Sequence, residues 1–362
     1  MRISLLLLLC VCLSPALGEE QAPPLPEDLQ KRIETAVTAG RQSLLDRLET
    51  PGCPLPLALH ALLHAGLPHD HPAVQAWLGK LDAHLEEAVS QSPYEAGLTA
   101  LLLADLHEKG SKERDFLKPL QRIADTLVSW QKPSGSWGYA ERPRGIRLNP
   151  QGLPLSDENN STLQVALLGL QAASHCGAQV PEKAWRQAAA FLLKDQQPPV
   201  GPKGEDPGPA GWDYGAAGER TLPYQSMTAA GVASLLLCAD HLAKEDPLLL
   251  RIRASVKAGL RWMDGNFSLY SERGGLCHQY YYLYTLERLG AFARTGTLGG
   301  KPWYRKGAEF LVGHQGKDGG WTSTEDPRAT TAFALLFLTR ASRGVAPYPV
   351  QDFDPGKVPP KP

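Results

Sequence analysis

Six short, almost wholly apolar segments recur along this chain, and they constrain its fold more than any other feature. Each is centred on a small residue followed by leucine, and the centres lie about 40 to 70 residues apart, as in arrays of helical hairpins with inserted loops. Alanine and leucine favour helix over strand. A helix that is apolar on every face has to be buried on every side. The six centres are 61–63, 100–102, 166–168, 234–236, 285–286 and 334–336.

Amphipathic segments alternate with these apolar ones, at 26–48, 72–89, 115–130, 181–193, 247–263 and 302–312. An open array of helical hairpins would expose both terminal faces and would need polar capping repeats. Closing the array into a ring removes both ends. We therefore predict an all-α fold, an (α/α)6 toroid with six inner and six outer helices, whose long loops gather at one mouth.

The first 18 residues have the pattern of a secretory signal peptide, with a basic Arg2, an apolar core at 5–13 and a small residue at Gly18. The apolar core is too short for a stable membrane anchor, and no later segment is long and apolar enough to span a membrane. We predict a secreted or periplasmic protein cleaved after Gly18. One toroid domain at 19–343 is expected, followed by a Pro-rich tail at 344–362.

The charge of the chain is almost balanced. It has 37 Lys and Arg residues against 38 Asp and Glu, a formal net charge of −1, and the leader contains only one of these residues, Arg2. Such a balance argues against nucleic acid or an anionic membrane as the main partner.

Four cysteines follow the leader, and no two of them have the C-x-x-C spacing of a zinc knuckle. They are Cys53, Cys176, Cys238 and Cys277. Export permits disulfides, but Cys176 and Cys238 lie in apolar helical segments. We predict buried free thiols at both positions.

Three turns combine a glutamine with a glycine-flanked tryptophan, at Gln131 to Trp137, Gln196 to Trp212 and Gln315 to Trp321. They resemble the QW repeats of squalene and hopene cyclases. From 26 to 343 the chain resembles the squalene-cyclase/prenyltransferase superfamily of α/α toroids, and more narrowly its exported bacterial members, whose typical motifs are similar to 281–290 and 332–338. The resemblance implies the same toroid, with Trp137, Trp212 and Trp321 as structural turns.

The chemical motifs of that superfamily are not present. Class II cyclases carry a D-x-D-D acid before Thr-Ala, whereas 327–330 has no carboxylate and Asp326 lies one position outside the run. The zinc positions of protein prenyltransferases resemble Gly275, Cys277 and Thr330, and one thiolate cannot make a zinc site. The Cys-Gly-x-x-Gln thioester run is also missing. We therefore predict no metal and no cofactor.

Polar residues cluster in the sequence where the apolar helices begin. The candidate mouth residues are Asp157, Glu158, Tyr224, His278, Tyr281, Asp326 and Arg328. Inner helices that run parallel share one mouth, and their aligned dipoles favour an anion there. Arg328 would add a positive charge. The structural alternatives are helix capping by Asn160, Ser161 or Asp326, and a core position for Tyr281.

Three functions are compatible with these residues. The leading hypothesis is a non-catalytic ligand-binding or scaffold protein. The alternative is a carbohydrate-active enzyme at the same mouth, either a lyase that uses His or Tyr as the base or a glycosidase with two carboxylates. The third is an isoprenoid-modifying enzyme. The expected ligands are accordingly an acidic saccharide or an isoprenoid.

Overall fold

The computed structural model describes residues 24–48, 55–109, 115–138, 158–215, 222–269, 278–323 and 326–342. Within them the chain forms thirteen α-helices, and its only β-pairings are isolated bridges. The predicted all-α class is confirmed. The leader at 1–18 and the tail at 344–362 lie outside the described residues, as do Cys53, Asp157, Gly275 and Cys277.

The helices fall into two groups that differ in burial. Six of them are buried along most of their length: α2 (Leu55–His64), α5 (Pro93–Lys109), α7 (Asn160–His175), α9 (Gln225–Asp240), α11 (Gln279–Phe292) and α13 (Pro327–Leu338). The others bury one face each: α1 (Glu27–Leu45), α3 (Pro72–Leu78), α4 (Leu81–Gln91), α6 (Leu117–Ser129), α8 (Glu182–Asp195), α10 (Leu248–Asn266) and α12 (Trp303–Gly313). This division follows the apolar and amphipathic segments of the sequence.

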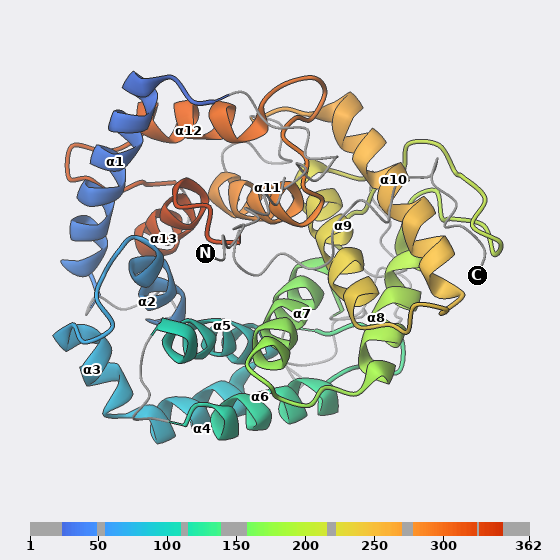
Figure 1. Ribbon diagram of the computed structural model, residues 1–362, viewed down its shortest axis with the longest axis horizontal. Helices are drawn as coiled ribbons and strands as arrows, with labels where there is room; N and C mark the ends of the chain where they lie inside the picture. Colours follow the sequence, from blue (N-terminus) through green and yellow to red (C-terminus); the bar gives the residue numbers. More distant parts are fainter. Residues whose placement is uncertain are drawn as a thin grey trace, which may run out of the picture.

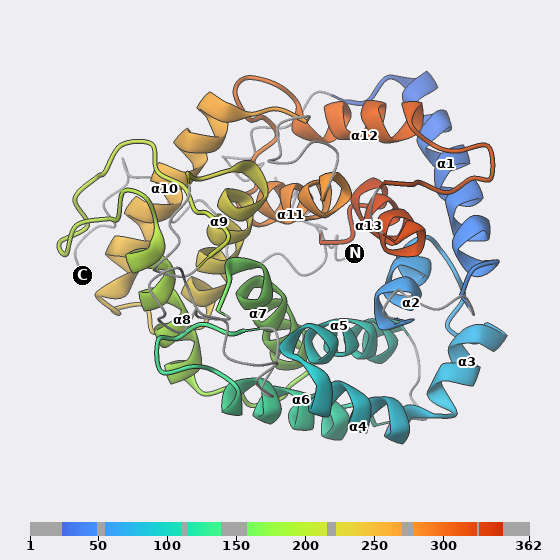
Figure 2. The same cartoon turned by 180° about the vertical axis from the view of Figure 1, so that it is seen from behind.

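The buried helices contact one another in chain order. The helix α2 packs against α5, α5 against α7, α7 against α9, α9 against α11, and α11 against α13. The last of them, α13, packs against α2. The amphipathic helices lie outside this group in both views (Figures 1 and 2).

One amphipathic segment is divided. The sequence predicted a continuous helix at 72–89, but the structure has α3 and α4, separated by Gly79 and Lys80. Gly79 caps α3, and Lys80 leaves the helical region with φ −118° and ψ 22°. Glycine is a poor helix former, which explains the break at this point.

Side-chain caps begin the buried helices α7 and α13. Asn159 accepts a hydrogen bond from the backbone N–H of Thr162 (2.8 Å) at the start of α7. Asp326 accepts one from the backbone N–H of Arg328 (2.8 Å) at the start of α13. The α7 cap is therefore one residue earlier than the Asn160 or Ser161 proposed from sequence, because the helix itself begins at Asn160.

The three tryptophans of the glutamine–tryptophan turns are fully buried. Each indole N–H of Trp137, Trp212 and Trp321 donates to a backbone carbonyl of the preceding amphipathic helix. The acceptors are Leu127 in α6 (2.8 Å), Leu192 in α8 (3.0 Å) and Leu311 in α12 (2.8 Å). The backbone N–H groups of Trp212 and Trp321 also donate to threonines of the next buried helix, Thr228 (3.2 Å) and Thr331 (3.0 Å). Trp212 and Trp321 thus join an amphipathic helix to the buried helix that follows it.

The glutamines of the same turns join successive outer helices. Each side-chain amide donates to one carbonyl of its own turn and to one carbonyl of the next outer helix. The second acceptors are Ala184 in α8 for Gln131 (2.9 Å), Ser255 in α10 for Gln196 (3.0 Å) and Ala36 in α1 for Gln315 (2.8 Å). The last bond links α12 to α1, the two outer helices most distant in sequence.

Glycine is required in two of these turns. Gly135 and Gly319 have φ of +100° and +79°, which L side chains rarely adopt. An added Cβ would also lie 2.1 Å from the Gln187 carbonyl oxygen and 2.6 Å from that of Ala39. The turns therefore press directly against the backbone of α8 and α1.

In the part of the chain that the structure describes, no helix has the length and apolar character needed to cross a membrane.

Candidate functional site

The described candidate mouth residues lie at the starts of four buried helices, α7, α9, α11 and α13. Asp157 lies outside the described residues. Glu158 accepts a hydrogen bond from the Ser134 hydroxyl, and Tyr224 is half-buried at the start of α9. His278 is exposed and takes a left-handed φ of 63° just before α11. Asp326 and Arg328 contact each other, and Tyr281 contacts residues of α7.

The charge of Arg328 is neutralised within its own helix start. Its Nε and Nη2 atoms donate to the two oxygens of Asp326, at 3.2 and 3.1 Å. Burial opposes ionisation of Asp326, but the hydrogen bonds from Arg328 hold the pKa of that carboxyl below its usual value. The guanidinium is therefore already paired, and the positive charge expected to attract an acidic ligand is offset.

Tyr281 is the centre of a chain of hydroxyl groups that joins α5, α7 and α11. Its hydroxyl accepts from the Ser161 hydroxyl (3.0 Å) and donates to the Gln164 side-chain oxygen (2.8 Å). Because Ser161 donates to Tyr281, the Tyr94 hydroxyl at 3.1 Å donates to Ser161. The chain leads from half-buried Tyr94 to fully buried Gln164.

The polar end of this chain is not satisfied. The amide nitrogen of Gln164 is buried and has no hydrogen-bond partner. A buried donor without a partner destabilises the folded state by about 1–3 kcal/mol. Such donors are therefore usually hydrogen-bonded to water or to a ligand. The aromatic rings of Tyr284 and Phe333 lie beside Tyr281, with ring centroids at 6.3 and 5.9 Å. The surroundings therefore combine uncharged polar groups with aromatic faces.

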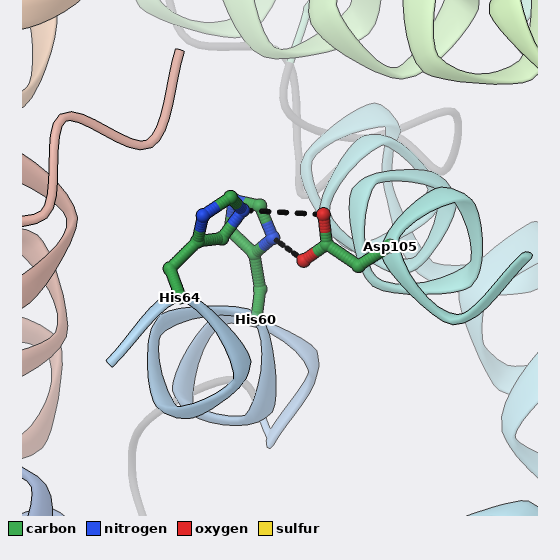
Figure 3. A group of neighbouring side chains, drawn as sticks. All are labelled: His60, His64 and Asp105. Atoms are coloured by element: carbon green, nitrogen blue, oxygen red, sulfur yellow. Dashed lines mark hydrogen bonds and ion pairs between the residues drawn. The ribbon is translucent and has the colours of Figure 1, made fainter. Parts of the chain in front are cut away.

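A second polar cluster lies near the carboxyl ends of α2 and α5, where the sequence suggested no site (Figure 3). His60 Nδ1 lies 2.6 Å from one oxygen of Asp105, and His64 Nε2 lies 3.1 Å from the other. The two imidazole rings are edge to face, with centroids 4.8 Å apart. The Nε2 atom of His60 is buried without a hydrogen-bond partner.

The protonation of this cluster follows from burial and charge. Burial lowers the pKa of His60, although Asp105 opposes the shift, so the ring is neutral near pH 7. The Asp105 carboxyl is buried too, but His60 and His64 hold its pKa well below the usual range. An ionised carboxylate only accepts, so the ring nitrogens that face it carry the protons.

The sequence contained a signal for this cluster. His60 and His64 are four residues apart in an otherwise apolar helix, which places them on one face. Asp105 is a carboxylate within the apolar stretch of a second helix. A charged residue buried in an apolar helix requires a hydrogen-bonding partner, and the two histidines are the partners of Asp105.

The predicted free thiols are confirmed at Cys176 and Cys238, but only Cys238 is fully buried. Cys176 is half-buried because it is the cap that follows α7 rather than part of its apolar face. Burial, together with the nearby carboxylates of Glu108 and Asp105, raises the pKa of the Cys176 thiol to about 11.

Alkylation of Cys176 should accordingly be slow. With a pKa about two above that of an ordinary thiol, its thiolate population at pH 8 is about 100-fold lower. We expect iodoacetamide to modify Cys176 about 100-fold more slowly in the folded chain than in urea, with the rate rising about tenfold per pH unit. Peptide mass spectrometry at several pH values measures this, and equal rates in both states would contradict the raised pKa.

Comparisons with known proteins add little to this description. No family model and no curated protein matches the chain. A crystal structure of a protein from Actinoplanes is similar, with 18% sequence identity and a TM-score of 0.49. The match covers 85% of this chain and 99% of that one. At this level of similarity the function has to be argued from the residues themselves.

Proposed function

We propose that this protein is an exported (α/α)6 toroid of the cyclase/prenyltransferase-like superfamily that binds a neutral polar ligand, of the saccharide type, without reacting with it. The return of α13 to α2 supports the ring. The bond from Gln315 to Ala36 supports closure of the outer layer.

The observation that carries the ligand site is the chain of hydroxyls ending at Gln164. Tyr281, Ser161 and Gln164 present uncharged donors and acceptors, and the Gln164 amide nitrogen has no partner. Sugar hydroxyls offer both donors and acceptors, and sugar rings pack on aromatic faces such as Phe333. A neutral ligand fits better than an acidic one because Arg328 is paired with Asp326.

Binding is favoured over catalysis because two of the candidate carboxylates, Asp326 and Glu158, have structural partners. Asp326 caps α13 and holds Arg328. Glu158 is hydrogen-bonded to Ser134. A glycosidase needs two carboxylates available to one glycosidic bond, and a lyase needs an available positive charge beside the substrate carboxylate.

The test is a calorimetric screen of neutral oligosaccharides, uronate oligosaccharides and farnesol. We expect a neutral oligosaccharide to bind. Tyr281→Phe should lower its affinity about 3- to 10-fold, the effect of losing one neutral hydrogen bond. Tyr304→Phe is the matched control, since that hydroxyl donates to the Leu338 carbonyl (2.7 Å) and lies on α12.

Other outcomes would each contradict this proposal. Binding of uronates alone, sensitive to His278→Ala and Arg328→Ala, would support the acidic-ligand hypothesis. Binding of farnesol alone would support an isoprenoid site. Equal affinity of wild type and Tyr281→Phe would mean that Tyr281 does not contact the ligand. The absence of binding to any of these compounds would favour the scaffold hypothesis.

A further inference from the structure

The cluster of His60, His64 and Asp105 has the composition of a metal site. Two imidazoles and a carboxylate are ligands that Zn²⁺ accepts, and three protein ligands leave its fourth position open. Within the residues that the structure describes, this is the group of three His, Cys, Asp or Glu side chains whose ligand atoms lie within 4.8 Å of one another.

The geometry of the cluster is close to that of bound ligands. The separations from Asp105 oxygens to His60 Nδ1 and His64 Nε2 are 2.6 and 3.1 Å. Ligand atoms around a tetrahedral zinc ion, with bonds of about 2.0–2.1 Å, lie about 3.3 Å apart. The two His–Asp separations would therefore have to lengthen by less than about 1 Å to admit an ion, and all three ligand atoms already lie within 4.8 Å of one another. On binding, each neutral ring would carry its proton on the nitrogen that faces away from the ion.

The electrostatic surroundings favour a cation. His64 is the last residue of α2, and Asp105 lies near the end of α5. The carboxyl end of a helix carries partial negative charge. The Asp105 carboxylate adds a full negative charge at a buried position, so a cation would offset its desolvation. The His64 side chain is 18% exposed, so an ion could reach the cluster from solvent on this side.

One neighbouring cation is already engaged. The positive charge of Arg288 contributes to the lowered pKa of His60. Its guanidinium stacks on the Tyr284 ring, 3.4 Å from the centroid, and lies 3.7 Å from the Glu287 carboxylate. The Glu287 carboxylate lies close enough to offset part of this charge.

We propose that His60, His64 and Asp105 bind one zinc-type divalent transition-metal ion, with water or a small anion in the fourth position. The ligand atoms are His60 Nδ1, His64 Nε2 and an Asp105 oxygen. The site is independent of the ligand site above, because Tyr281 and Ser161 lie in the first turns of their helices and this cluster lies towards the opposite ends. It also shares no residue with Gly275, Cys277 and Thr330, on which the expectation of no metal rested.

The experiment measures metal binding by the purified full chain after chelator treatment and dialysis. We expect calorimetry to show one equivalent of Zn²⁺ per chain, with elemental analysis giving the same ratio. Co²⁺ should give the visible absorption of a tetrahedral site, and Mg²⁺ should not compete because it prefers six oxygen ligands. Zinc should also raise the melting temperature of the stripped protein.

Two variants assign the ion to these residues. Asp105→Asn keeps the shape of the side chain, and His64→Ala removes the more exposed ring. Each should lower zinc affinity by about 100-fold or more. His84→Ala is the matched control, because His84 faces the single carboxylate of Glu87 at 4.0 Å and stacks on Trp77. Circular dichroism confirms that each variant is folded.

Three results would overturn the proposal. The first is a wild-type chain that retains no stoichiometric zinc or cobalt at neutral pH. The second is unchanged affinity in Asp105→Asn and His64→Ala. The third is an equal loss in His84→Ala, which would assign binding to the surface. In any of these cases the cluster is a structural hydrogen-bond group between α2 and α5.

Discussion

Replacing Trp321 by alanine should lower the free energy of unfolding by about 3–5 kcal/mol, the range for a large buried aromatic side chain. The indole is fully buried, and its N–H donates to the Leu311 carbonyl at 2.8 Å. It also abuts α1, because a Cβ added at Gly40 would lie 2.6 Å from the ring. Loss of the side chain would therefore loosen α1, α12 and α13 together. Urea unfolding followed by circular dichroism measures the change.

Two further variants separate packing from hydrogen bonding at this position. Trp321→Phe keeps most of the apolar volume and loses the indole N–H, so we expect a loss between those of wild type and Trp321→Ala. Trp262→Ala makes the same substitution at a half-buried indole on α10 and should cost less than half as much. A loss below about 1 kcal/mol for Trp321→Ala would mean that the turn does not hold the outer helices.

The second large effect is expected at Gly169, where α7 crosses α5. A Cβ added at Gly169 would lie 2.6 Å from the Cα of Gly97 and 3.3 Å from its carbonyl oxygen. A Cβ added at Gly97 would lie 2.4 Å from the Val165 carbonyl oxygen. These neighbours are backbone atoms and cannot move aside without separating the helices. We expect Gly169→Ala to cost about 2–3 kcal/mol, at the upper end for an overpacked core.

The matched control for Gly169→Ala should have the opposite sign. Gly265 is exposed in α10, and an added Cβ there would meet no atom within 4 Å. Alanine is the better helix former, so Gly265→Ala should be neutral or stabilise the protein by up to about 1 kcal/mol. Chemical denaturation of both variants in parallel measures the difference. A neutral Gly169→Ala would show that α5 and α7 can part at no cost.

The class of the fold and its pattern of burial were predictable from local sequence alone. The apolar segments became the buried helices and the amphipathic ones became the outer helices, with 72–89 divided at Gly79 and Lys80. The Gln and Trp of each turn were also identifiable, since a large aromatic in a glycine-containing turn after an amphipathic helix has few places to pack. These features depend on residues that are near one another in the sequence.

The candidate site was predicted only in part, and electrostatics were the weakest point. The sequence placed Arg328 at a helix start but could not show that its guanidinium is paired with the carboxylate of Asp326, two residues away. The sequence also selected Tyr281 without its partners, Ser161 and Gln164. Both pairings depend on side-chain rotamers and on the rotation of each helix about its axis, which hydrophobic periodicity does not specify.

The distribution of apolar residues in this chain determined which segments are helical and which helices are buried, because it shows how many faces of each helix avoid water. Only the tertiary structure decided which polar side chains meet. Tyr281 and Ser161 are 120 residues apart in sequence, and His60 and Asp105 are 45 apart. Their hydrogen bonds of 3.0 and 2.6 Å require two helices to be adjacent and correctly rotated. That arrangement results from the packing of all the buried helices, including the contact of Gly97 with Gly169, and no single segment encodes it.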